Sequence, residues 1–284
     1  MKTILEVITS GSAYLVQHGV DEARLNMEHL LAHILGCRRL DLYLRYQETL
    51  QEPELKPLRD LLRRRGEGVP LQHLLGTVHF LEHEFVSDHR ALIPRPETEY
   101  LVEVLIKEVS DGQKKLPTTL LDMGTGSGCI GLSLASAWPS TEVTLADISE
   151  EALDLAALNA SRLGLKNICL RRSSLFEKLP GRWNMIVANL PYIPTEEIKS
   201  LSREVRFDPK TALDGGKDGL ETIRSLLEAA PLHLCQEGRV ILEVGYDQAA
   251  KVEQICKDLS YSNINTFKDL SCVSRFVSAQ WLSC

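Results

Sequence analysis

The chain has 284 residues, of which 44% are hydrophobic and 25% are charged, and its formal net charge is −7. These proportions are typical of a globular protein with a sizeable core, and the length predicts one large domain or two ordinary ones. No apolar run approaches the roughly 18 residues that cross a bilayer. The seven cysteines are scattered without a CxxC pair, and the histidines lack metal-binding spacing. We therefore expect a cytoplasmic protein with no disulfide framework and no metal site.

The first 75 residues are predicted to form a small helical bundle. Apolar side chains recur at helical spacing over residues 21–36, and leucines repeat the pattern over residues 53–68. This segment carries ten basic and ten acidic side chains, so the whole net charge of −7 belongs to residues 76–284. An acidic region of this kind is a poor binder of nucleic acid. The arginine run 63–65 fits either a solvated helix face or a contact with an anionic partner.

The remainder of the chain changes from helices to an α/β pattern. Partial alternation of aromatic and β-branched residues over 76–88 predicts a β-hairpin, and two prolines then precede an amphipathic helix within 92–106. From about residue 117, strands alternate with helices, which predicts a mostly parallel sheet covered on both faces. We expect strands near 119–123, 142–146, 168–172, 184–188, 239–244, 262–267 and 273–281, one of the last two running antiparallel.

A glycine-rich turn joins a strand to a helix within residues 119–135. Gly124, Gly126 and Gly128 allow a tight turn and a close approach of the backbone to a ligand. Dinucleotide-binding folds carry similar turns, but Asp122 on the strand suits a cationic amino-acid head, which a dinucleotide lacks. Asp147 ends the second strand, where a carboxylate suits the hydroxyls of an adenosine ribose or caps the next helix. The pattern predicts a site for S-adenosylmethionine or a dinucleotide.

A polar segment, Asn-Leu-Pro-Tyr-Ile-Pro, occupies residues 189–194 directly after the apolar run 185–188. Asparagine and proline favour turns, so a plain turn is one interpretation. In a doubly wound sheet, however, ligands bind outside the carboxyl ends of the strands. Asn189 and a backbone carbonyl fixed by the proline could accept both hydrogens of a planar amide or aromatic amine, against which Tyr192 packs. Such a grip orients a poorly nucleophilic nitrogen toward a methyl donor.

Nearly the whole chain resembles the release-factor glutamine methyltransferases, the HemK or PrmC family. The glycine turn is shared by most methyltransferases, whereas "LIPRPETE" and "ALDGGKDGL" are far more specific to this family. The matching segments are "LQHLLGTVHF" (71–80), "LIPRPETE" (92–99), "LDMGTGSGCI" (121–130), "ADIS" (146–149), "NLPYI" (189–193), "FDPKTALDGGKDGL" (207–220) and "LEVGYDQ" (242–248).

The resemblance implies a Rossmann-like class I methyltransferase with a seven-stranded, mostly parallel α/β sheet. Its domains would be a helical substrate-docking domain (1–75), a β-hairpin linker (76–90) and a methyltransferase domain (91–284). The reaction would move a methyl group from S-adenosylmethionine to the glutamine amide of the Gly-Gly-Gln loop of peptide chain release factors, leaving S-adenosylhomocysteine. We expect a monomer without membrane or direct nucleic-acid partners.

The resemblance also assigns site residues. Catalysis and substrate binding fall to Asn189, Leu190, Pro191 and Tyr192. Cofactor binding falls to Asp122, Met123, Gly124, Thr125, Gly126, Ser127, Gly128, Asp147, Ile148, Ser174, Leu175 and Asn189.

Two positions depart from the family pattern. Leu190 replaces the usual first proline; its carbonyl can still accept, but the restriction of φ is lost. Ser174 stands where an aspartate often contacts the adenine. Two other functions remain open: a nucleic-acid adenine or cytosine amino-methyltransferase using the same grip on a flipped base, and a non-catalytic cofactor-binding module.

Overall fold

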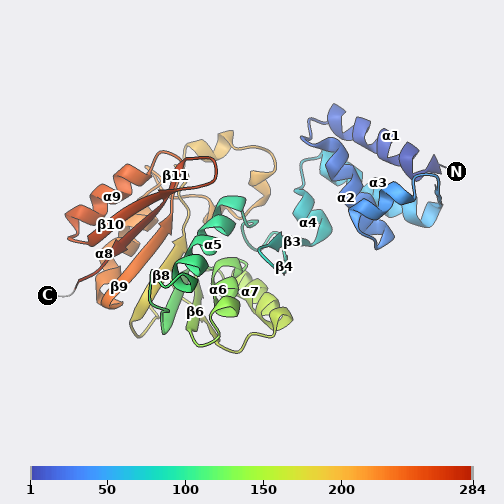
Figure 1. Ribbon diagram of the computed structural model, residues 1–284. Coiled ribbons are helices and arrows are strands. Elements are labelled where there is room, and N and C mark those ends of the chain that lie inside the picture. The colour runs from blue at the N-terminus through green and yellow to red at the C-terminus, as the bar shows by residue number, and fades with distance from the viewer. Residues whose placement is uncertain (1, 283–284) are drawn as a thin grey trace. The chain divides into compact units, whose positions relative to one another are not determined.

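The protein is described by a computed structural model, which covers residues 2–282. The chain divides into two compact units (Figure 1). Unit 1 contains the residues up to Thr77 together with the short segment Ser202–Phe207, and unit 2 contains Val78–Leu201 and the residues from Asp208 onward. The backbone therefore passes between the units three times. None of the described helices is long and apolar enough to cross a membrane.

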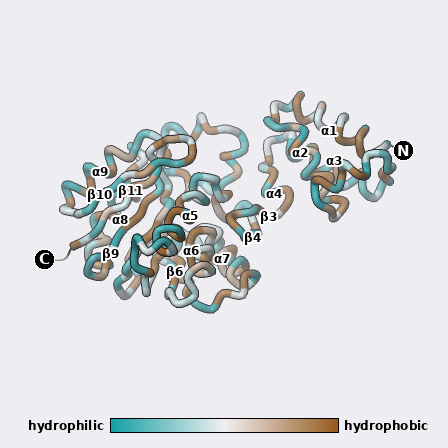
Figure 2. The backbone as a smooth tube through the Cα atoms, in the orientation of Figure 1, coloured by the Kyte–Doolittle hydropathy of each residue, from teal (hydrophilic) through white to brown (hydrophobic). Residues whose placement is uncertain are grey.

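Unit 1 is a bundle of helices α1 (Ile4–Gln17), α2 (Ala23–Leu35), α3 (Glu52–Gly66) and α4 (Leu71–Leu75), with a 3-10 helix at Arg39–Leu44 and a short pair of strands, β1 (Lys2–Thr3) and β2 (Thr49–Leu50). Hydrophobic and hydrophilic stretches alternate along α1 (Figure 2). The apolar sides of α1, α2 and α3 enclose one core that includes Ile8, Leu30 and Leu58. Gly36 ends α2 in the left-handed conformation, which glycine adopts without strain.

The arginine run is not a free basic surface. Arg63 pairs with Asp60 and Glu67 on its own helix. Arg65 is only 4% exposed, and its guanidinium donates to Asn26 Oδ1 at 2.7 Å and to Glu204 Oε1 at 2.6 Å. Arg65 thus anchors the segment Ser202–Phe207 inside unit 1, a long-range connection that no local pattern indicates.

Unit 2 is built on a seven-stranded sheet with the order β10-β11-β9-β8-β5-β6-β7. Neighbouring strands pair in parallel from β9 to β7, whereas β11 runs antiparallel to both β9 and β10. The strands are β5 (Thr119–Met123), β6 (Glu142–Asp147), β7 (Ile168–Arg172), β8 (Trp183–Asn189), β9 (Leu234–Glu243), β10 (Ser262–Lys268) and β11 (Ser274–Gln280). All seven predicted strands are confirmed, although β9 begins five residues before the predicted start.

Helices cover both faces of the sheet. Alternate residues of the strands point to opposite faces, so that in β8 Ile186 belongs to one core cluster and Val187 to the other. The first cluster is completed by α8 (Glu221–Ala229) and α9 (Ala249–Asp258). The second is completed by α5 (Pro96–Ser110), α6 (Cys129–Ala137) and α7 (Glu150–Leu163). This three-layer arrangement exposes the carboxyl ends of the parallel strands to ligands.

The predicted hairpin is present as β3 (Thr77–Phe80) and β4 (His83–Val86). Phe80 and Phe85 are buried in the second core cluster of unit 2, with their rings edge to face. Asn159 of α7 exchanges hydrogen bonds with the backbone of Val86 and also donates to the carbonyl of Ser127 at 2.9 Å. The hairpin strand β4 is therefore tied through Asn159 to the end of the glycine turn.

Candidate active site

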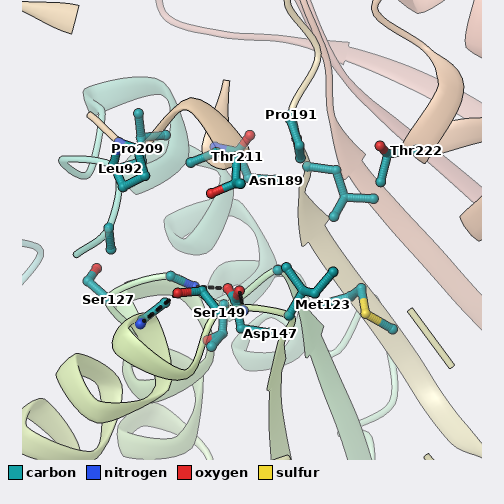
Figure 3. A pocket seen from close by; sticks show the side chains of 18 of the residues that line it. Leu92, Met123, Ser127, Asp147, Ser149, Asn189, Pro191, Pro209, Thr211 and Thr222 are labelled. Carbon is teal, nitrogen blue, oxygen red and sulfur yellow. Dashed lines mark hydrogen bonds between the residues drawn. The ribbon is translucent and has the colours of Figure 1, made fainter. Parts of the chain in front are cut away.

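A cavity of about 710 Å³ lies in unit 2 at the carboxyl ends of β5, β6 and β8. Its volume is within the range of ordinary small-molecule sites. Figure 3 shows Ser127, Asp147 and Ser149 on one side and Asn189, Pro191 and Thr211 on the other. We call the first side the cofactor wall (residues 123–127, 147–149 and 173–175) and the second the substrate wall (residues 90–98, 189–191 and 209–225).

The cofactor wall is organised by the glycine turn. The N–H groups of Gly124 and Thr125 both donate to the carbonyl of Ala146, at 2.8 and 3.0 Å, which fastens the turn to the end of β6. Gly124 has a φ of 72°, and a Cβ there would lie 2.9 Å from Leu190 Cδ2. A side chain at this position would be strained and would displace the substrate wall, so the turn requires glycine.

Asp147 joins the turn to the second strand. Its Oδ2 accepts from the N–H of Gly126 and its Oδ1 from the N–H of Ser149, both at 2.9 Å. Burial raises the pKa of Asp147, and these two donors oppose that shift. The cap of α7 is Ser149, whose Oγ accepts from Ala152 N. Asp147 therefore is not the helix cap and faces the cavity, where its remaining lone pairs suit vicinal hydroxyl groups.

Asp122 lies beneath the turn and not in the cavity. It is completely buried, and its Oδ2 accepts from Thr125 Oγ1 at 2.6 Å and from Gly131 N at 2.9 Å. Its Oδ1 is buried without a hydrogen-bond partner among the described residues, and burial raises its pKa to about 6. The predicted direct contact with a cationic head does not follow from this geometry. Asp122 instead connects the turn to α6.

Most of the other predicted cofactor residues line the cavity. Met123, Gly124, Thr125, Gly126, Ser127, Ile148, Ser174 and Leu175 all do so, together with Asp147 and Asn189. Gly128 does not: it precedes α6 with a φ of 85°, and a Cβ there would meet Leu132 and Ala156. Its function is to let the helix begin close to its neighbours, a packing role that the spacing of the glycines alone does not distinguish from ligand contact.

The segment after β8 divides between cavity and core. Asn189, Leu190 and Pro191 line the cavity, and the Leu190 side chain is buried against the glycine turn. Tyr192 is absent from the lining and packs against the first core cluster, where burial raises its pKa to about 12. The position of the Tyr192 side chain therefore does not favour the predicted packing of its ring on the substrate.

The segment 208–220 supports the backbone of Pro191 and Tyr192 from behind. Ile193 N donates to the carbonyl of Leu213 at 3.0 Å, and Gly215 N donates to the carbonyl of Ile193 at 2.9 Å. A Cβ on Gly215 would lie 2.7 Å from the carbonyl oxygen of Pro191. The buried amide of Gln248 donates to Tyr192 O at 2.8 Å. These contacts give a structural reason for the glycines of the "ALDGGKDGL" segment.

Sequence reasoning missed the other half of the substrate wall. Residues of the "LIPRPETE" segment line the cavity beside residues 209–214, although the two are more than 100 positions apart. Buried Asp208 connects them, because it accepts from Ile93 N at 3.2 Å and from Arg95 Nη2 at 2.8 Å. Burial raises the pKa of Asp208 to about 6, with Arg95 opposing the shift. The only sequence signal for these residues is that they belong to the segments "LIPRPETE" and "FDPKTALDGGKDGL", which match the family pattern. Over the whole cavity, the lining residues that were not predicted are Arg90, Ala91, Leu92, Pro94, Arg95, Thr98, Cys129, Ile130, Ser149, Ala152, Ser173, Pro209–Ala212, Asp214, Glu221, Thr222 and Ser225.

The residues present fit S-adenosylmethionine. Gly126 lines the cavity without a side chain, and Asp147, which accepts from its N–H, has further acceptor positions for a ribose. Met123, Leu175 and Leu190 supply apolar surface for a base and a methylthio group. Asn189 stands on the opposite wall with a polar amide (Figure 3). The arrangement can hold a methyl donor on one side and a planar acceptor on the other.

Comparison with known proteins agrees with this site. Residues 6–76 match the PrmC N-terminal domain family, and residues 97–205 match the methyltransferase small domain family. The chain is 38% identical over 280 residues to a release factor glutamine methyltransferase of Geobacter sulfurreducens, covering 98% of this chain and 96% of the relative. A protein of the same name from Pseudomonas aeruginosa is 39% identical over 91% of this chain and 93% of the relative.

Solved structures confirm the fold. A ribosomal protein L11 methylase from Lactobacillus delbrueckii subsp. bulgaricus is 21% identical with a TM-score of 0.51, covering 72% of this chain and 96% of that chain. A 16S rRNA methyltransferase of Thermus thermophilus, solved with AdoMet and guanosine, has a TM-score of 0.51 at 18% identity, covering 72% of this chain and 49% of that chain. At these identities the likeness concerns the fold alone.

Proposed function

Because the chain belongs to the family of release factor glutamine methyltransferases, we propose that it methylates the glutamine side chain of the Gly-Gly-Gln loop of peptide chain release factors. The methyl donor is S-adenosylmethionine, and S-adenosylhomocysteine is the product. The reaction forms a bond from the methyl carbon to the amide nitrogen, breaks the bond to sulfur and releases one amide proton. The modification takes place in the cytoplasm, where translation termination occurs, and the enzyme acts as a monomer.

The observation that carries the proposal is the position of Asn189. Its side chain leaves the carboxyl end of β8 and faces the glycine turn across the cavity. Its Nδ2 donates to Thr98 Oγ1 at 3.2 Å, while no protein donor among the described residues is hydrogen-bonded to its Oδ1. An amide oxygen held in this way at the cavity is suited to accept one hydrogen of a substrate amide.

Asn189 and Leu190 contribute to the reaction by orienting the substrate amide. An amide nitrogen is a weak nucleophile because its lone pair is delocalised. Asn189 Oδ1 and the carbonyl of Leu190 accept the two amide hydrogens and keep the nitrogen pointed across the cavity. Leu190 and Pro191 close the wall against water. Holding reacting groups in this way contributes a large part of the rate without a strong base. When bound, the sulfonium cofactor supplies an electrophilic methyl group.

The direct test is Asn189→Ala. The variant lacks one of the two acceptors, so single-turnover methyl transfer to intact release factor should fall on the order of 100-fold. Thermal melting should change little, because the residue stands at the mouth of the sheet. If Asn189→Ala methylates release factor at nearly the wild-type rate, the amide grip is wrong and the segment is only a turn.

The identity of the cofactor has a separate test. Calorimetric titration should show binding of S-adenosylhomocysteine and none of NAD at the same concentrations. Asp147 suits the ribose of either adenosine ligand, whereas the Asn189 amide on the opposite wall suits a substrate that accepts a methyl group. Tight binding of NAD without S-adenosylhomocysteine would contradict the assignment.

Unit 1 is proposed to dock the release factor. Its 3-10 helix exposes apolar side chains, with Leu40 at 65% and Leu44 at 89% exposure beside Tyr43 at 44%. A cluster of exposed apolar residues on a separate compact unit is typical of a surface for a protein partner. The neutral charge of residues 1–75 also favours a protein over a nucleic-acid backbone.

A further inference from the structure

Hydrogen bonds connect Asn189 and Thr98, which line the cavity, to the buried carboxyl of Glu243. Asn189 Nδ2 donates to Thr98 Oγ1 at 3.2 Å, and Thr98 Oγ1 donates to Glu243 Oε2 at 2.7 Å. Asn189 and Glu243 are paired in register at the ends of the parallel strands β8 and β9, and Thr98 comes from the first turn of α5. Thr98 is 2% exposed and Glu243 is 3% exposed.

Which group donates in each of these two hydrogen bonds follows from the donors and acceptors that each side chain carries. An ionised carboxylate only accepts hydrogen bonds, so the single hydroxyl hydrogen of Thr98 is given to Glu243. The Thr98 oxygen can then only accept from its other neighbour. The donor group Nδ2 of Asn189 must face Thr98, and Oδ1, on the opposite side of the planar amide, is turned away from it. Glu243 thereby selects one of the two ways in which the Asn189 amide can be placed.

We propose that Glu243, acting through Thr98, is a positioning residue that presents the oxygen of the Asn189 amide, and not its nitrogen, to the substrate. The inference rests on the proposed function, because it assumes that the substrate group donates hydrogen bonds. A glutamine side-chain amide does so, with two hydrogens on its nitrogen. With the Asn189 amide turned over, two N–H₂ groups would face each other and the substrate would lose one acceptor.

The protonation state of Glu243 decides in which direction the hydrogen bonds between Glu243, Thr98 and Asn189 are donated. Burial raises the pKa of Glu243 to about 7. The hydrogen bond from Thr98, the charge of Arg275 and the nearby Asn189 side chain oppose this shift, and Glu97 adds to it. Glu97 belongs to α5 and Arg275 to β11, while Cys129 of α6 and Tyr192 after β8 also face the carboxyl. A protonated carboxyl donates to the Thr98 oxygen. The Thr98 hydrogen is then free to be donated to Asn189 Oδ1, which turns the amide over.

The orientation can be measured without activity. The experiment follows the side-chain amide signals of Asn189 in ¹⁵N–¹H spectra, assigned by their loss in Asn189→Ser, as pH is raised from 5.5 to 8.5. In the wild type these signals should shift with a midpoint near the titration of Glu243. The shift should persist in Thr98→Ser, which keeps the hydroxyl, become several-fold smaller in Thr98→Val, and disappear in Glu243→Gln. An unchanged titration of the Asn189 signals in Thr98→Val would overturn the inference.

Activity provides the second measurement. Thr98→Val should lower single-turnover methylation of release factor about tenfold, the size of one lost hydrogen bond, while the affinity for S-adenosylhomocysteine changes less than twofold. Thr98→Ser should recover the rate to within about threefold of wild type. If Thr98→Val methylates at the wild-type rate while Asn189→Ala is slow, the positioning role is wrong and the amide grip stands. If Asn189→Ala is also unimpaired, the proposed mechanism fails as well. Should Thr98→Val not fold, Glu243→Gln serves in both measurements.

Discussion

The two walls of the cavity are built in different ways. The cofactor wall comes from the ends of three adjacent strands, β5, β6 and β7, and from the turns that directly follow them. It is held by hydrogen bonds between these neighbouring turns, such as the one from Gly126 N to Asp147. The substrate wall is assembled from three segments far apart in the sequence, joined by Asp208 and by the contact of Gly215 with Pro191. A binding surface for a common cofactor can thus be local, whereas the specific substrate surface depends on long-range packing.

The buried carboxyl of Asp122 gives the largest expected effect on the cofactor wall. Because burial raises its folded-state pKa to about 6, from 3.8, the native protein keeps this proton where the unfolded chain has lost it. Raising the pH through this window therefore favours unfolding. The free energy of unfolding of the wild type, taken relative to that of Asp122→Asn, should fall by about 2 kcal/mol between pH 4 and pH 7. Denaturant melts at several pH values measure it.

The control for Asp122→Asn is Asp154→Asn, which removes one negative charge from the exposed side of α7. The same melts should be accompanied by calorimetry with S-adenosylhomocysteine. Because Asp122 lies beneath the turn, Asp122→Asn should retain most of the cofactor affinity at pH 7. If the free energies of unfolding of wild type and Asp122→Asn change with pH in parallel, the pKa of Asp122 is not raised by burial.

Gly215→Ala tests the substrate wall alone. The added Cβ would lie 2.7 Å from the carbonyl oxygen of Pro191 and must displace the segment that holds the substrate. We expect methyl transfer to release factor to fall between about 10- and 100-fold, with cofactor affinity changed less than twofold. Gly164→Ala is the matched control, because it is strained at a φ of 66° but has open space and lies outside the cavity lining. Gly164→Ala should lower Tm without slowing methyl transfer. Equal slowing in both variants would contradict the claim that Gly215 acts by holding the substrate wall in place.

Asp147→Ala tests the cofactor wall at its ligand-facing residue. Loss of the carboxylate removes the acceptors for a ribose and leaves the N–H groups of Gly126 and Ser149 without their partner. We expect the affinity for S-adenosylhomocysteine to fall about tenfold. At saturating cofactor, the rate of methyl transfer should recover toward wild type, because the substrate wall is intact. A rate that stays low at saturation would show that the two walls are not separable.

The smallest effect is expected outside both walls, on unit 1. Leu44→Ser removes the most exposed apolar side chain of the 3-10 helix, at 89% exposure. If this helix contacts the release factor, KM for the intact factor should rise about threefold, since most single interface residues contribute little. Methylation of a short peptide containing Gly-Gly-Gln should be unaffected. An equal change for peptide and intact factor would remove the docking role.

The comparison of the walls explains what the sequence could predict. The strands and the glycine turn follow from apolar runs and glycine spacing, which are local. The start of β9 was placed too late because Glu237 and Gly238 interrupt its apolar pattern. The placement of Tyr192 depends on Gln248 and the core, and the role of Thr98 depends on Glu243, 145 positions away. Such connections require the folded structure, because no spacing in the sequence encodes them.

The central claim is that this cavity transfers a methyl group to a glutamine amide. The most direct measurement is incubation of the full chain with labelled S-adenosylmethionine and, in parallel, release factor and rRNA, followed by mapping of the label. Our account predicts label on the side-chain nitrogen of the glutamine in the Gly-Gly-Gln loop, reduced on the order of 100-fold by Asn189→Ala. Label on rRNA bases with none on the release factor would contradict it.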